Sequence, residues 1–319
     1  MRAPVKKLYS LKSNHFIHAK RANRTIKRMD IVSLLRRFPC TPRGMARMVY
    51  SRSRLVWLRV VNRYGRSPIT EPAGPVVSLT SHGTRIKSVH LAIESIGRGQ
   101  IRPSRLILWL DDASMIENLP IGIRRLQKRG LEVLLSKNYG PHTKYYPYVE
   151  RLQKCEVPLV TADDDVLYPK YWLKSLLDAY QRFPEVVNCH RARVIAMTHD
   201  GIARYDTWPQ ADSTDQSLSL FALGIGGALY PPRLLERLKH EGTAFLNCCP
   251  KADDVWLHAQ ALRTGFKIRQ VAPRAFRPMI IPGTQNNALN HGNLAGGEND
   301  RQIETTYGTA DIERLRERQ

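Results

Sequence analysis

Carboxylate side chains are grouped at two points of this sequence. The first group is three consecutive aspartates, Asp163–Asp165, directly after the apolar run VPLVTA. Adjacent carboxylates repel one another, so a positive charge must offset them. Mg²⁺ and Mn²⁺ prefer carboxylate oxygens, and Mg²⁺ completes its shell with phosphate oxygens and water. Because residues i and i+2 of an extended chain point the same way, Asp163 and Asp165 could hold one metal ion and a nucleoside diphosphate, while Asp164 faces elsewhere and holds the turn.

The same triplet also fits a structural role without any metal ion. The segment after it, PKYWLKSLLDAYQRF, has helical spacing, and Pro169 suits the first turn of a helix. An acidic turn before that helix would let Asp165 cap its free backbone N–H groups. Three acids alone do not decide between a helix cap and a metal ligand.

The second acidic group, Asp253 and Asp254, precedes another helical pattern. Apolar residues recur at helical spacing from Val255 to Leu262, and Gly265 is placed to end the helix. We interpret Asp253 as the N-cap of this helix. Asp254, one position further, could face a cleft as a general base that the helix dipole keeps ionised.

The elements that would position these acids alternate between strands and helices. Short apolar runs predict buried strands, and segments with helical periodicity separate them. This alternation predicts an α/β fold with a mainly parallel central sheet and helices on both faces. The expected strands are VVSLTS, RLILWL, LEVLLS, VPLVTA and FKIRQV, and the helices between them include IKSVHLAIESIGRG, IGIRRLQKRG and TKYYPYVERLQKC.

Polar residues follow three of these strands at the point where each strand ends. Ser81 and His82 follow the first strand, Asp111 and Asp112 the second, and the aspartate triplet a later one. The carboxyl ends of parallel strands meet at one edge of a sheet, where such folds bind their ligands. The sequence therefore predicts one site at that edge.

Positive charge is concentrated at the start of the chain. The formal net charge is +22, and residues 1–70 carry eighteen Lys or Arg and one acid, a charge of +17. Such a region could lie on anionic lipid, bind nucleic acid or act as a transit peptide. Its basic and apolar residues are interleaved, which suits an amphipathic helix at a membrane surface and equally a helix packed on the rest of the protein. The remaining residues carry only +5, which disfavours a nucleic-acid-binding surface.

The motifs, taken together and in this order, resemble those of a known enzyme family. VVSLTSHGTRI, RLILWLDD, HTKYYPYV, VTADDDVLYPKYWL, CHRARVI, GIGGALYPP and CPKADDVWLHAQAL are similar to the motifs of bacterial GT-A-type glycosyltransferases of polysaccharide and cell-envelope assembly, related to the large family-2 group. The resemblance covers roughly residues 75–285. It implies a Rossmann-like GT-A fold that binds a nucleotide sugar, after a basic extension (1–70) and before a C-terminal segment (286–319) that contains a possible lid and a tail helix.

The resemblance also implies roles for individual residues. Asp163 and Asp165 match the ends of the DxD motif, which holds a divalent metal (Mn²⁺ or Mg²⁺) and the donor's diphosphate, and Asp254 matches the catalytic base. The remaining residues implied in donor binding are Thr80, Ser81, Asp111 or Asp112, Lys144, Asp164, Gly226 and Gly227. His291 would lie in the lid loop.

The implied reaction is transfer of a sugar from a nucleotide-diphosphate sugar, with a UDP-sugar as the expected donor, to a hydroxyl of a glycan or lipid-linked acceptor. The QxxRW motif of processive synthases is missing from the C-terminal part, so we expect a non-processive enzyme, with inversion at the anomeric carbon. We expect a cytoplasmic protein, peripheral on the inner face of the membrane through residues 1–70, that binds no nucleic acid. The alternatives are a basic nucleic-acid-binding protein and a non-catalytic α/β protein.

Overall fold

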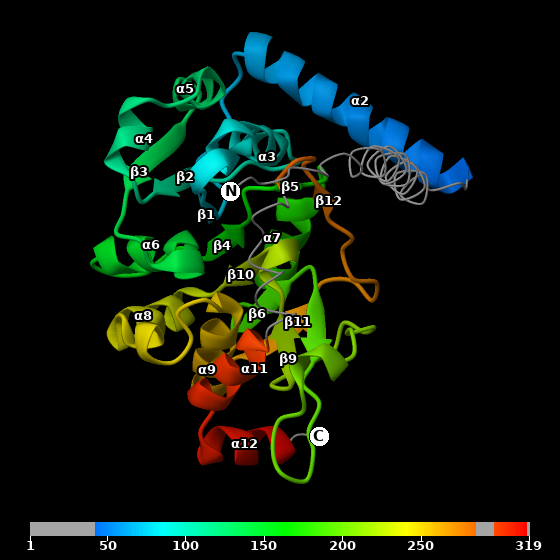
Figure 1. Cartoon of the computed structure of the whole chain (residues 1–319), viewed down its shortest axis with the longest axis vertical. Coiled ribbons are helices and arrows are strands. Elements are labelled where there is room, and N and C mark those ends of the chain that lie inside the picture. Colours follow the sequence, from blue (N-terminus) through cyan, green and yellow to red (C-terminus); the bar gives the residue numbers. More distant parts are fainter. Residues whose placement is uncertain (1–41, 285–296, 318–319) are drawn as a thin grey trace, which may run out of the picture. The chain divides into compact units, whose positions relative to one another are not determined.

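The computed structural model of the chain describes residues 42–284 and 297–317 (Figure 1). The chain divides into two units, residues 1–56 and 57–319. Of the first unit, the described part belongs to one helix, α2 (Pro42–Tyr64), which continues into the second unit. Within the second unit, Leu58 is fully buried and the Asn62 side chain donates a hydrogen bond to the carbonyl of Gly122, so the last turns of α2 are packed inside this larger unit.

The larger unit is built on an eight-stranded sheet with the order β3-β2-β1-β4-β10-β6-β11-β8. Neighbouring strands are parallel except where β10 pairs with β4 and β6, and where β8 pairs with β11. The predicted α/β fold with a mainly parallel central sheet is therefore confirmed. The strands are β1 (Val76–Thr80), β2 (Arg105–Leu110), β3 (Leu131–Leu135), β4 (Leu159–Ala162), β6 (Val186–Cys189), β8 (Gln216–Ser217), β10 (Ala228–Tyr230) and β11 (Lys267–Gln270).

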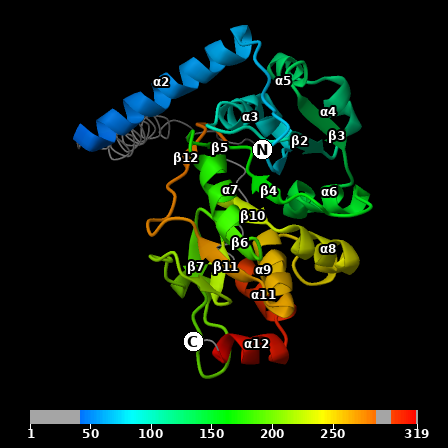
Figure 2. The same ribbon diagram turned by 180° about the vertical axis from the view of Figure 1, so that it is seen from behind.

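Alternate residues of the central strands enter two separate hydrophobic cores, one on each face of the sheet. Val77 and Leu79 of β1 belong to one core, and Val76 belongs to the other. Helices close both cores, as predicted (Figures 1 and 2). The first core is covered by α3 (Val89–Gly97), α5 (Ile121–Gln127) and α7 (Trp172–Arg182), and the second by α6 (Tyr146–Arg151), α8 (Pro232–Glu241) and α9 (Asp253–Thr264).

Two details of the chain path differ from the pattern in the sequence. The helix expected from Pro169 begins only at Trp172, because a short strand, β5 (Val166–Leu167), pairs with β12 (Met279–Ile280) and keeps the chain extended beyond the aspartates. The helix expected over TKYYPYVERLQKC is reduced to α6, and a 3₁₀ turn, η2 (Gly140–Lys144), precedes it.

Smaller elements complete the unit. After β2, α4 (Ala113–Glu117) lies near the sheet edge, and β7 (Ala192–Val194) pairs with β9 (Leu220–Ala222). Near the C-terminus, α11 (Glu298–Thr306) and α12 (Thr309–Arg316) contact α9. The expected lid loop with His291 lies outside the described residues.

A buried histidine attaches this C-terminal segment to α9. The Nε2 atom of His258 lies 2.9 Å from the carbonyl oxygen of Leu218, and its Nδ1 lies 2.6 Å from the hydroxyl of Tyr307. Because a carbonyl only accepts hydrogen bonds, Nε2 carries the proton and Nδ1 accepts from the tyrosine. Burial lowers the pKa of His258 to about 4.

This lowered pKa makes stability depend on pH. Below its ordinary pKa, His258 binds a proton in the unfolded chain and not in the folded one, so stability is present above pH 6.5 and is lost as the pH falls toward 4. Between pH 7 and pH 5 we expect this residue alone to remove about 2 kcal/mol of unfolding free energy. Urea denaturation at both pH values should therefore show a smaller pH-dependent loss for His258→Gln than for the wild type. The control His199→Gln alters an exposed histidine and should keep the wild-type loss; an unchanged loss in His258→Gln would contradict this account.

Candidate active site

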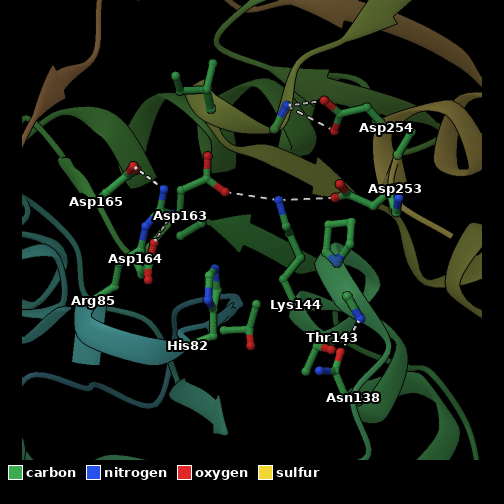
Figure 3. Close-up of a pocket in the computed structure, with 18 of the residues that line it drawn as sticks. His82, Arg85, Asn138, Thr143, Lys144, Asp163, Asp164, Asp165, Asp253 and Asp254 are labelled. Carbon is green, nitrogen blue, oxygen red and sulfur yellow. Dashed lines mark hydrogen bonds and ion pairs between the residues drawn. The ribbon is translucent and has the colours of Figure 1, made fainter. Parts of the chain in front are cut away.

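A cleft of about 710 Å³ opens at the edge of the sheet where the parallel strands end. From β1 the chain passes to β2 and β3 on one side of the sheet, and β4 then follows on the other side of β1. The order of the strands therefore reverses at β1. Ligand crevices form at such switch points of open α/β sheets. Figure 3 shows acidic and basic side chains from several elements converging there.

Most of the residues expected at the site line this cleft. They are Thr80, Asp111, Asp112, Lys144, Asp163, Asp164, Asp165 and Asp254. Ser81 is buried just behind the wall, where its hydroxyl donates to Asp164 at 2.6 Å. Gly226 and Gly227 do not line the cleft, and Gly224 from the same turn does. Strand ends distant in sequence thus meet at one place.

Lys144 is the cation at the centre of the acidic side chains. Its Nζ lies 3.0 Å from Asp163 and 3.1 Å from Asp253, between the two acidic groups of the sequence (Figure 3). Burial favours the uncharged amine, but Asp163, Asp253 and Asp254 outweigh it and raise the pKa of Lys144 well above its usual value. Lys144 therefore stays charged and holds two walls of the cleft together.

Arg85 is the second cation and holds the other two aspartates of the triplet. It lies in η1 (Gly83–Lys87), and its guanidinium is 3.0 Å from Asp164 and 3.5 Å from Asp165. Its Nε also donates to the carbonyl of Thr284 at 3.2 Å. With Ser81 on its other oxygen, Asp164 has both carboxylate oxygens engaged. The expectation that Asp164 faces elsewhere is wrong, because it lines the cleft and shares Arg85 with Asp165.

The suggestion that Asp165 caps a helix is wrong. Its backbone carbonyl accepts a hydrogen bond from Ile281 at 2.7 Å, which continues the β5–β12 pairing, and α7 starts seven residues later. Its carboxylate lies beside Arg85 at the cleft. Burial, then Asp163 and Asp164, raise the pKa of Asp165 to about 6.

The N-cap interpretation of Asp253 is also wrong. The N-cap of α9 is Ala252, which leaves Asp253 in the first turn with its carboxylate on Lys144. Asp253 therefore belongs to the charged cluster. No local pattern indicates that Asp253 pairs with Lys144, which lies far from it in the sequence.

Asp254 faces the cleft and is held by a backbone N–H group. The amide of Gly224 lies 3.1 Å from each of its carboxylate oxygens. A Cβ atom at Gly224 would come within 3.0 Å of Asp254 and 3.3 Å of Lys144, so a larger residue here would push these two side chains from their positions. The expectation that the helix dipole keeps Asp254 ionised is wrong, because burial and then Asp253 raise the pKa of Asp254 well above its usual value.

At the opposite end of the cleft the polar groups are partly engaged in local structure. Thr80 donates its hydroxyl to the carbonyl of Trp109 at 3.1 Å. Asp112 is the N-cap of α4, and its carboxylate accepts from both the amide and the hydroxyl of Ser114, which lowers the pKa of Asp112. Asp111 is partly exposed to the cleft. Of the two alternatives, Asp111 is thus the carboxylate whose side chain is not used as a cap.

The donor set at the triplet suits a hard divalent cation. In residues 42–284 and 297–317, no cluster of three or more His, Cys, Asp or Glu is arranged to enclose a metal ion. Mg²⁺, however, needs only one or two carboxylates when phosphate oxygens and water supply the rest. Asp163 and Asp165 are two such carboxylates at the cleft, and a cation bound there would favour the ionised form of Asp165, whose pKa burial and the two neighbouring aspartates raise. These residues therefore fit the expected ion.

Comparison with known proteins finds similarity in fold only. No family model matches the chain, and no curated protein has a matching sequence. A mannosyltransferase from Pyrobaculum calidifontis, solved with GDP-mannose and Mn²⁺, is 13% identical over 85% of this chain and 78% of its own, with a TM-score of 0.47. Residues 1–349 of S. aureus TarS are 11% identical over 61% of this chain and 58% of their own, with a TM-score of 0.39. A CMP-2-keto-3-deoxy-manno-octonic acid synthetase with CTP is 10% identical over 61% of this chain and 87% of its own, with a TM-score of 0.38. Glycosyltransferases and a nucleotidyltransferase are thus among the proteins with similar folds, and expectations about chemistry depend on the cleft itself.

The central ion pairs give a prediction about stability. Lys144→Met leaves Asp163, Asp253 and Asp254 without their cation, which should cost about 3–5 kcal/mol of unfolding free energy at neutral pH. The carboxylates would then bind protons more tightly in the folded state than in the unfolded state, so the deficit should shrink as the pH falls from 8 to 6. Urea denaturation at the two pH values measures both effects.

Lys174→Met is the matched control, because it removes an exposed i,i+4 pair with Asp178. It should cost less than about 1 kcal/mol and show no such recovery at low pH. An equal and pH-independent loss in both variants would contradict the central role of Lys144.

Proposed function

We propose that the chain is a glycosyltransferase that uses a nucleotide-diphosphate sugar. The observation that supports this proposal best is the arrangement of Asp163, Asp165 and Asp254 around Lys144 in a single cleft at the switch point of the sheet. The triplet would hold a divalent ion (Mn²⁺ or Mg²⁺) and the diphosphate, and Asp254 would face the acceptor. The donor we propose is a UDP-sugar, with the nucleoside toward Thr80 and Asp111.

The chemistry assigned to each residue follows from its surroundings. A divalent cation, when bound, would neutralise charge on the leaving diphosphate. Lys144 orients Asp163 and Asp253 and adds a fixed positive charge at the same place. A carboxylate oxygen of Asp254 would take the proton of the acceptor hydroxyl as that oxygen bonds to the anomeric carbon and the bond to the diphosphate breaks. Only the ionised form of Asp254 can act as this base, and Lys144 and the Gly224 amide favour that form against the burial that raises the pKa of Asp254.

A nucleic-acid-binding protein and a non-catalytic protein explain these features less well. Nucleic-acid binding requires a basic surface, and the part of the chain after residue 70 is near neutral with acids at its cleft. A non-catalytic protein gains nothing from a cluster of carboxylates with raised pKa values in an open cleft, whereas catalytic sites need such groups. Our proposal also includes inversion of configuration at the anomeric carbon and the addition of a single sugar to each acceptor.

Aspartate variants test the assignment of roles. Asp163→Asn/Asp165→Asn should abolish Mn²⁺-dependent binding of UDP, measured by calorimetry. Asp254→Asn should keep that binding and lower transfer from the preferred nucleotide sugar about 10²- to 10⁴-fold, because only the proton acceptor is lost. Asp178→Asn, an exposed position, is the control. Release of a nucleoside diphosphate indicates sugar transfer, and release of pyrophosphate or full activity in Asp254→Asn would overturn the proposal.

We further propose that the basic N-terminal region binds an anionic membrane surface, where a lipid-linked acceptor would be found. Among the residues that the structure describes, no helix could cross a membrane. The exposed apolar side chains of helix α2 all lie on one face of the helix, which covers less than half of its circumference. Exposed Arg52, Arg59 and Arg63 lie along one edge of this face. The apolar residues are Met45, Val49, Tyr50, Val56, Trp57, Val60 and Tyr64.

Vesicle co-sedimentation tests this surface. The protein should bind vesicles that contain phosphatidylglycerol more tightly than pure phosphatidylcholine, and less tightly as salt rises. Val56→Asp/Val60→Asp should weaken binding at least about tenfold, because apolar burial at the interface is lost. Val157→Asp, at another exposed valine, is the control. Preference for RNA or DNA over vesicles, or equal binding by both variants, would contradict the proposal.

A further inference from the structure

Two arginines lie just behind the part of the cleft wall that Tyr205 and the Gly224 turn form, without lining the cleft themselves, and the chemistry proposed above does not use them. Arg191 and Arg193 flank Ala192, which is fully buried in the core. Alternate residues of an extended segment point to opposite sides, so the two arginine side chains share the side away from that core. Both are half-buried.

Their contacts connect them with the wall of the cleft. Arg193 donates to the carbonyl of Tyr205 at 2.7 Å, and its guanidinium lies 4.9 Å from the centre of the Tyr205 ring, which lines the cleft. Arg191 packs against the turn η4 (Gly224–Gly226), where a Cβ atom at Gly226 would meet it at 3.1 Å. The same turn supplies the amide that holds Asp254.

The two guanidinium groups are close enough to affect each other, and no carboxylate pairs with them. Burial and then Arg193 lower the pKa of Arg191. Within the described residues, neither arginine forms an ion pair, and the buried Nε atom of each has no hydrogen-bond partner. The nearby carboxylates are engaged with backbone amides, Asp254 with Gly224 and Asp300 with Tyr205.

Two half-buried cations without an anion are costly, because they repel each other and have lost hydration. Guanidinium groups bind phosphate oxygens through paired, charge-assisted hydrogen bonds, so a phosphate group would offset both costs.

We propose that Arg191 and Arg193 form a subsite for a phosphate group of the acceptor. This inference rests on the proposed function, in which the donor's diphosphate lies at Asp163 and Asp165. An anion bound beside Tyr205 and the Gly224 turn is then on the side of Asp254 where the acceptor hydroxyl must lie. The phosphate can belong to a lipid carrier or to a phosphorylated sugar, and the two share the same recognition chemistry.

Calorimetry with two soluble probes, an alkyl phosphate and a hexose phosphate, tests the subsite. Binding of each probe to the full-length protein is measured twice, once with the protein saturated with UDP and Mg²⁺ and once without them. The second measurement detects the phosphate subsite even if the protein does not bind UDP. Arg191→Gln should weaken binding of at least one probe by about tenfold or more, while UDP binding stays at the wild-type level. Tighter binding of the alkyl phosphate identifies a lipid-type acceptor, and tighter binding of the hexose phosphate a sugar-type acceptor.

Matched variants separate this site from the donor site. Arg274→Gln alters an exposed arginine and should leave phosphate binding unchanged. Asp163→Asn should lose UDP binding and keep phosphate binding, and thermal denaturation confirms that each variant is folded. Equal phosphate binding in the wild type and Arg191→Gln overturns the subsite. Loss of UDP binding in Arg191→Gln also overturns it, because the arginine would then serve the donor.

Discussion

The contact of Lys144 with Asp163 and Asp253 is the interaction on which the rest of the site depends. The two aspartates come from different parts of the chain, one after β4 and the other in the first turn of α9, and a single ammonium group holds both at about 3 Å. Without it, neighbouring elements would bring like charges together in a partly buried place. The position of η2, which carries Lys144, is therefore set by electrostatics as much as by packing.

The cleft contains more negative than positive charge even with its two central cations. Five aspartates, at positions 163–165, 253 and 254, surround Lys144 and Arg85, and burial raises the pKa of several of these carboxyl groups. Proteins tolerate such an excess where a bound cation or a proton-transfer step makes use of it. On the Asp254 side the imbalance is reversed at Arg191 and Arg193, so charges of opposite sign flank the place where we propose that the acceptor hydroxyl lies.

The sequence predicted the sheet and the place of the site because both depend on local patterns. Buried strands that end in polar residues bring Thr80, Asp111 and Asp163 to one edge whatever the details of packing. The pairing of Arg85 with Asp164, 79 residues apart, has no local signature. The direction of β10 was also beyond prediction, since three apolar residues carry no sign of orientation. Because β10 runs against β4, the Gly224–Gly226 turn before it lies at the edge where β4 ends.

Strand β10 also divides the sheet. It runs against both neighbours, so β1–β4 and the β6–β11 pair form two separate parallel blocks, each followed by its own helices. In the proposed reaction the nucleotide would contact the first block, whereas Asp254 and, apart from Lys144, the groups near it follow strands of the second block. Substitutions or insertions in the second block could therefore change which acceptor is used without disturbing the donor half. This construction would allow related chains to diversify their products while they keep one activated sugar.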